Sequence, residues 1–83
     1  MINKFIKVNA LRYEGIFDKN PGQLEYRYPQ IININNIIFC RPTRDNEKYE
    51  KANTIITLRD KYKCYCEETF EMVEKLISSA MSW

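Results

Sequence analysis

Apolar and polar residues alternate along the first part of the chain. Ile6, Val8 and Ala10 are separated by single polar residues, and alternation with a period of two is typical of a strand with one buried face. Leu11 and Tyr13 stand at odd-numbered positions, so their side chains would point to the opposite face of the strand. Either a β-bulge changes the buried face there, or both faces of this strand are partly covered. The pattern predicts a long strand near the start of the chain.

A second alternating segment follows a strong turn signal. The turn signal is the Pro-Gly dipeptide within residues 18–22, which suits the two central positions of a β-turn. Apolar and charged residues alternate again from Leu24 onward. We therefore expect a long hairpin in which residues 4–17 pair with residues 23–35. Pro29 has no N–H to donate, so it should lie at a sheet edge or at a bulge.

Three further strands are predicted after the hairpin, at residues 37–41, 54–59 and 61–66, and Arg59-Asp60-Lys61 is predicted to turn the chain between the last two. An Asn-Asn pair at residues 35–36 separates the first of these from the hairpin, because asparagine tolerates turn conformations. Residues 42–51 are charged and show neither a helical nor an alternating period, so they are predicted to form a solvated loop.

The clearest helical pattern covers residues 69–81. Thr69 is a suitable N-cap, since its hydroxyl can accept an unpaired backbone N–H. Acidic residues within 67–74 suit the positive end of the helix dipole. The predicted buried stripe has helical spacing and consists of Phe70, Val73, Leu76, Ile77, Ala80 and Met81. Its burial would contribute on the order of 10 kcal/mol, at roughly 1.5–3 kcal/mol per large side chain.

Together these elements predict a single α+β domain spanning residues 1–83. We expect a mostly antiparallel sheet of four to five strands, with one C-terminal amphipathic helix packed on one face. The chain of 83 residues is 45% apolar and 29% charged, as expected of a globular protein. No apolar run is long enough to span a bilayer, and the N-terminus lacks signal-peptide features. A cytoplasmic protein of bacterial or phage origin is expected.

Candidate chemistry is sparse. The chain has no histidine, which removes the commonest general base and metal ligand. Cys64 and Cys66 would share one strand face and could meet a metal together with Cys40, but three cysteines at this spacing do not match a zinc site. Burial as small apolar side chains is the favoured interpretation. Glu67 and Glu68 would oppose a thiolate at Cys66. The sequence therefore predicts no enzyme, no catalytic residues, no metal and no cofactor.

A candidate interaction surface is suggested by aromatic and basic residues on the predicted strands. Such residues can stack nucleobases on an open sheet, although tyrosine is also a common half-buried strand residue. The net charge of +2 gives nucleic-acid binding little support. The candidate residues are Tyr13, Tyr26, Arg27, Tyr28, Lys63 and Tyr65.

The favoured function is a protein–protein interaction module that associates with itself and with an unknown protein. One helix can cover only one face of the sheet, and a second copy would cover the other face and the unpaired edges. A small nucleic-acid-binding regulator is the first alternative. A phage-encoded inhibitor of a host protein is a further alternative. No membrane partner is expected.

Four segments carry a family resemblance. They are residues 5–8, residues 34–38 with their Asn-Asn break, residues 53–58 with the sequence NTIITL, and residues 66–77 leading into the predicted helix. In this order they resemble small bacterial accessory proteins of flagellar and swarming motility, the FlbD/SwrD type, and related small proteins of Bacteroides-type bacteria. The resemblance covers roughly half of the chain. It implies a non-enzymatic accessory protein and no active-site residue.

Overall fold

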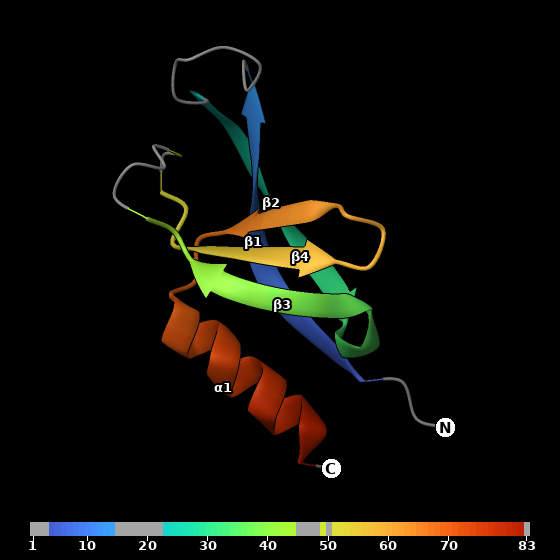
Figure 1. Ribbon diagram of the computed structural model, residues 1–83. Coiled ribbons are helices and arrows are strands. Elements are labelled where there is room, and N and C mark those ends of the chain that lie inside the picture. The colour runs from blue at the N-terminus through green and yellow to red at the C-terminus, as the bar shows by residue number, and fades with distance from the viewer. Residues whose placement is uncertain (1–3, 15–22, 45–48, 50, 83) are drawn as a thin grey trace.

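The chain forms a five-stranded sheet and one α-helix (Figure 1). The computed structural model describes residues 4–14, 23–44, 49 and 51–82, with residues 14 and 23–25 described by their backbone alone. In chain order the elements are β1 (Phe5–Glu14), β2 (Gln23–Asn33), the 3-10 helix η1 (Ile34–Asn36), β3 (Ile37–Pro42), β4 (Thr54–Leu58), β5 (Lys63–Cys66) and α1 (Phe70–Met81). The predicted α+β class is confirmed.

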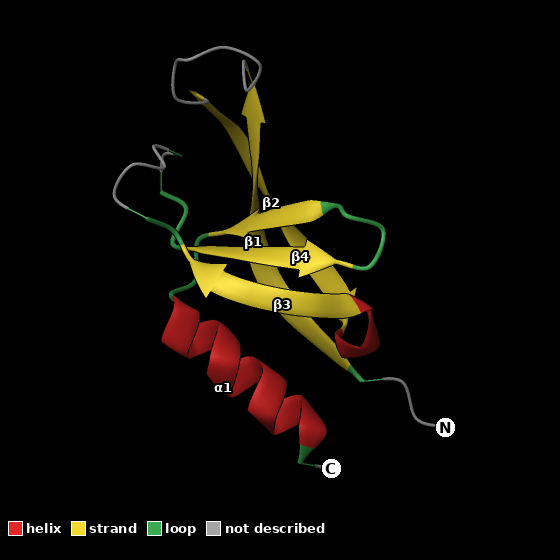
Figure 2. Ribbon diagram, viewed as in Figure 1, coloured by secondary structure: helices red, strands yellow, loops and turns green. Residues whose placement is uncertain are grey.

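The strands lie in the order β2-β1-β5-β4-β3, and each pairs with its neighbours in antiparallel fashion. β1 pairs with β5 only through Ala10 and Leu11, so the two strands diverge on either side. Figure 2 shows β1 and β2 running across the direction of β3 and β4. Two backbone hydrogen bonds of η1 continue existing strand pairings. The N–H of Ile34 donates to Lys4 O at 3.0 Å beyond β1 and β2, and the N–H of Arg59 donates to Asn36 O at 2.8 Å beyond β3 and β4, and η1 itself links the two edge strands β2 and β3.

Most predicted boundaries differ from the structure by a few residues. β1 ends at Glu14 and β2 at Asn33, and residues 15–22, which include the predicted turn, lie outside the described residues. The expected break at residues 35–36 is η1. The prediction placed residues 59 and 61–62 in strands, and this was wrong. The turn predicted at Arg59-Asp60-Lys61 is confirmed, since the N–H of Lys61 donates to Leu58 O at 2.9 Å, and the two strands stop short of it.

The main core lies between the sheet and α1. Thr69 caps the helix as predicted, since its hydroxyl accepts the N–H of Met72 at 3.2 Å. The predicted stripe is wrong at Met81, the last helical residue, whose side chain is 64% exposed. The buried members of the core are Ile6, Val8, Ala10, Ile32, Ile56, Cys64, Cys66, Val73 and Ala80.

A second, smaller cluster covers the other face of the sheet. Leu11 and Tyr13 are buried there together with Ala52, and Tyr49 packs against them. β1 is therefore covered on both faces. This explains why Leu11 and Tyr13 are apolar although they lie on the face opposite to Ile6, Val8 and Ala10. The prediction of a wholly solvated loop over residues 42–51 was wrong, because Tyr49 is only partly exposed and its ring packs on the sheet.

Each edge strand of the sheet carries a proline whose backbone nitrogen points away from the neighbouring strand. Asn9 directs its N–H and C=O toward residues 67–68, so its β2 partner Pro29 turns its nitrogen away from β1. The N–H of Thr43 points toward β4 and donates to Asn53 O. The backbone groups of neighbouring strand residues point in opposite directions, so the nitrogen of Pro42 points away from β4. The predicted edge position of Pro29 is confirmed. Both edges lack a donor that a further strand would need.

Candidate functional site

The six residues predicted to form one surface lie on both faces of the sheet. Residues opposite each other on paired strands share a face. Tyr28 pairs with the core residue Ala10, and Tyr26 pairs with Arg12, so both tyrosines lie on the α1 side. The remaining predicted residues are on the opposite face, namely Tyr13, Arg27, Lys63 and Tyr65. The structure therefore does not unite the predicted set.

Tyr13 and Tyr65 contribute to packing. The ring centroid of Tyr13 lies 5.3 Å from that of Tyr49 and 5.6 Å from that of Tyr65, and the Tyr49 and Tyr65 centroids are 4.6 Å apart. These are favourable distances for aromatic pairs. Only 5% of Tyr13 is exposed, so this ring is not available to a partner. The contacts among the three rings hold Tyr49 against the sheet.

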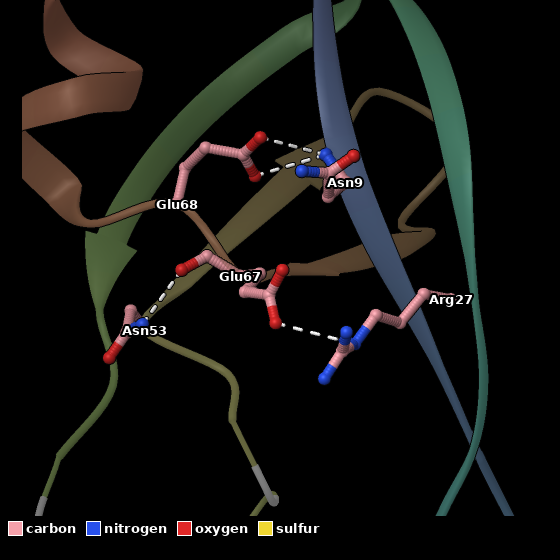
Figure 3. A network of polar contacts seen from close by, with 5 residues as sticks. All are labelled: Asn9, Arg27, Asn53, Glu67 and Glu68. Atoms are coloured by element: carbon pink, nitrogen blue, oxygen red, sulfur yellow. Dashed lines mark hydrogen bonds and ion pairs between the residues drawn. The ribbon is translucent and has the colours of Figure 1, made fainter.

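Arg27 and Lys63 are both exposed on that outer face. Arg27 Nε lies 3.3 Å from Glu67 Oε2 (Figure 3). The two side chains are 47% and 34% exposed. Water therefore screens the ion pair, which contributes little to stability. The pair joins β2 to the segment that precedes α1.

A carboxylate fills the gap where β1 and β5 diverge. The backbone N–H of Asn9 donates to both oxygens of Glu68, at 3.0 and 2.9 Å, and the side-chain amide of Asn53 donates to Glu67 O at 2.7 Å (Figure 3). The hydroxyl of Thr54 donates to Glu68 O at 2.8 Å. Glu68 therefore acts in place of a neighbouring strand. The sequence pattern pointed only to the helix dipole for these acids.

Three tyrosines form an exposed group on the α1 side of the sheet, which we call the tyrosine surface: Tyr26, Tyr28 and Tyr62. The ring centroids of Tyr26 and Tyr28 are 5.7 Å apart, and the hydroxyls of Tyr28 and Tyr62 are 3.4 Å apart. Tyr26 is 51% and Tyr62 42% exposed. The hydrogen bond to Tyr62, and then burial, raise the pKa of Tyr28 above its usual 10.0. Tyr28 is therefore a neutral phenol near pH 7.

The six-residue surface predicted from the sequence left out Tyr62. Tyr62 alternates in step with Cys64 and Cys66, which are buried in the main core. This spacing indicates that Tyr62 faces the α1 side of the sheet. Its contact with Tyr28 depends on the coiling of the sheet, because Tyr62 precedes β5 while Tyr28 lies in β2 on the far side of β1. No local pattern gives that pairing.

Positive charges flank Tyr62 in the turn between β4 and β5. We call residues 59–63 the basic turn, because Arg59, Lys61 and Lys63 are exposed there. Arg59 is anchored, since its Nε donates to Asn35 O at 2.6 Å. A shallow pocket of about 150 Å³ adjoins the turn and is lined by Asn36, Leu58, Arg59 and Asp60.

The cysteines have the properties of packing residues. Cys64 and Cys66 are buried, and the thiol of Cys64 donates to Gln30 Oε1 at 3.3 Å. The hydrogen bond with the Cys64 thiol, followed by burial, raises the pKa of Cys66, and burial raises that of Cys40. A raised pKa disfavours the reactive thiolate at Cys66 and Cys40, whereas the hydrogen bond with Cys66 lowers the pKa of Cys64, against the effect of its burial. In the described part of the chain, histidine, cysteine and acidic residues form no group of three that could hold a metal.

Comparison with protein-family models, with curated proteins and with solved structures found no match to this chain. The resemblance to small motility accessory proteins therefore stays a prediction. Among the helices of the described residues, none combines the length and apolar character that crossing a membrane requires.

Proposed function

We propose that this chain is a small, non-catalytic binding module that makes protein–protein interactions. The observation that carries the proposal is the exposure of large apolar side chains on an otherwise packed domain. Phe5 and Ile31 are 52% and 68% exposed, and they are diagonal neighbours on the outer face, because Phe5 pairs with Asn33 and Lys7 with Ile31. The other exposed large side chains are Tyr26, Ile38, Phe39, Tyr62, Met72 and Met81.

Partners should meet this module through side chains on its faces. The outward nitrogens of Pro29 and Pro42 interrupt the donor rows of β2 and β3, and proline on an edge strand discourages the addition of another strand. α1 also packs against β3. A self-associated form would therefore bury the patch of Phe5 and Ile31 between two copies, without joining their sheets.

Light scattering after size-exclusion chromatography tests self-association. Over roughly 5–500 µM, a range that spans typical weak association, the average mass of the native chain should rise with concentration. The variant Ile31→Lys should remain monomeric, because a lysine at the centre of the contact would be desolvated without a partner. Ser78→Lys on the exposed face of α1 is the matched control and should behave as the native chain. A native chain that is monomeric throughout the range would contradict self-association.

Nucleic-acid binding is a second candidate function, supported by the neighbourhood of the tyrosine surface and the basic turn. Exposed aromatic rings beside cations are the usual arrangement for stacking unpaired bases. The candidate predicts that a single-stranded oligonucleotide binds at low salt and is released steeply as salt rises. Absence of retention on an oligonucleotide column at low salt would remove it.

A further inference from the structure

We propose that the tyrosine surface and the basic turn together bind an acidic segment of a partner protein. This inference rests on the proposed protein-binding function and adds the place of the contact and the chemistry of the partner. The tyrosines supply rigid rings with polar tips, and the turn supplies positive charge. Tyrosine and arginine are enriched at the centres of protein interfaces.

Charge complementarity identifies the occupant as acidic. Within the basic turn the one acid is Asp60, and its Oδ1 accepts the N–H of Tyr62 at 3.0 Å. No described carboxylate forms an ion pair with Lys61 or Lys63. The acids of the described chain gather instead near the start of α1, within residues 67–74. Figure 1 shows the turn between β4 and β5 far from that end of α1.

The backbone of the basic turn gives independent support. Lys61 has a φ of 69°, in the left-handed region where glycine and asparagine are favoured and a lysine is disfavoured. The last residue of a three-residue hairpin turn commonly adopts this conformation, and glycine is the usual choice. A lysine there costs stability, and it directly precedes Tyr62 in the exposed turn. A strained residue within an exposed aromatic and charged surface points to a binding role for its side chain.

An acidic peptide fits this surface better than a nucleic acid does. The affinity of a protein for nucleic acid grows with the number of phosphates it neutralises, and the basic turn offers three cations. The net charge of the chain is only +2, so there is no extended positive track for a polyanion. A short segment with a few carboxylates matches the extent of the charge, and its apolar side chains can pack on Tyr26 and Tyr62.

The test is selection from a displayed library of random 12-residue peptides against the folded native chain. Selected peptides should be enriched in Asp and Glu over the starting library. The strongest binders are then synthesised with a fluorescent label and titrated by anisotropy. We expect Tyr62→Ala and Lys61→Glu each to weaken binding by about tenfold, as loss of an interface anchor or reversal of a contact charge does. Selection of neutral or basic peptides would overturn the proposal.

Two lysines with the same backbone conformation provide a matched pair of variants. Lys51 also has a positive φ, of 65°, but lies at the end of the segment before β4. Glycine relieves the backbone at either position, so Lys61→Gly and Lys51→Gly should both raise the melting temperature. Only Lys61→Gly should weaken peptide binding, by roughly fivefold for the loss of one surface charge. Equal affinities for the two variants would overturn the proposal, and misfolding could not explain the result.

Two further outcomes separate this inference from the proposed function. If Ile31→Lys abolishes binding of the selected peptides while Tyr62→Ala does not, the chain binds proteins through the outer face and the inference is wrong. If no peptide is selected and a labelled 12-nucleotide oligo-dT binds at low salt, protein binding and this inference both fail in favour of nucleic-acid binding.

Discussion

Among substitutions of the acidic residues near the start of α1, Glu68→Ala should lower the stability of the fold most. Both carboxylate oxygens of Glu68 accept the N–H of Asn9, at 3.0 and 2.9 Å. That N–H has no strand partner, because the β1–β5 pairing consists of Ala10 and Leu11. The variant Glu68→Ala therefore leaves a backbone donor of a central strand without its partner, next to the short contact that joins two parts of the sheet.

The size of the effect follows from the type and the exposure of the bond. A hydrogen bond to a charged group contributes about 1.5–3 kcal/mol to stability. Glu68 is partly exposed and Asn9 is exposed, so water will replace part of the interaction. We expect Glu68→Ala to lower the free energy of unfolding by about 1–2 kcal/mol. Glu68→Gln retains one acceptor oxygen and should lose about half of that.

Urea denaturation followed by circular dichroism measures this difference. With a slope of about 1 kcal/mol per molar urea for a small domain, the midpoint of Glu68→Ala should fall by about 1–2 M. Glu74→Ala is the control, since Glu74 is exposed on α1 and its removal should change stability by less than about 0.5 kcal/mol. Equal midpoints for Glu68→Ala and Glu74→Ala would refute the role assigned to the Glu68 carboxylate.

Four further predictions concern single residues. Val73 is fully buried, so Val73→Asp should abolish the circular dichroism signal of the folded chain. An unpaired buried charge costs more than the several kcal/mol that stabilise a small domain. A cooperative melt of this variant would contradict the packing of α1. Lys61→Gly should add about 0.5–1 kcal/mol of stability in urea, by relief of its left-handed backbone, and a loss of stability would refute that reading of the turn. The pKa of Tyr28 is raised from 10.0 in the folded chain, so the folded state keeps this proton longer than the unfolded state and stability should fall as pH rises above about 10. Tyr28→Phe should flatten that fall, and an unchanged pH profile would argue against the hydrogen bond between Tyr28 and Tyr62. Pro29→Val restores an outward N–H on β2 and should produce association by light scattering at concentrations where Ser78→Val does not.

The secondary structure was largely predictable because its signals are local. Alternation identified β1, the Asn-Asn pair identified η1, and helical spacing with the Thr69 cap identified α1. The turn from Arg59 to Lys61 was predicted, and only the strand limits at residues 59 and 61–62 were too long. Lys61 closes the turn at a positive φ, where glycine is the usual residue, so the end of the turn was not evident from the sequence.

The candidate site was less predictable because it depends on long-range geometry. Alternation shows which residues share a face of one strand, but the coiling of the sheet decides which strands meet. It buries Tyr13 beneath Tyr49 and brings the hydroxyl of Tyr62 to that of Tyr28. The role of Glu68 was hidden for the same reason, since its partner Asn9 is 59 residues away in the chain.

The short contact between β1 and β5 divides the sheet into two units, the β1–β2 hairpin and the β3–β4–β5 meander, which share the main core and the packing of α1. Only Ala10 and Leu11 join them as strand neighbours, while the hairpin itself pairs from Phe5 to Glu14. In native-state hydrogen exchange, amides along this seam should open at a lower free energy than those inside either unit. The hairpin could then leave as one piece and dock on the meander of another molecule, so exchange of hairpins between copies is the misassembly to which this architecture is most exposed.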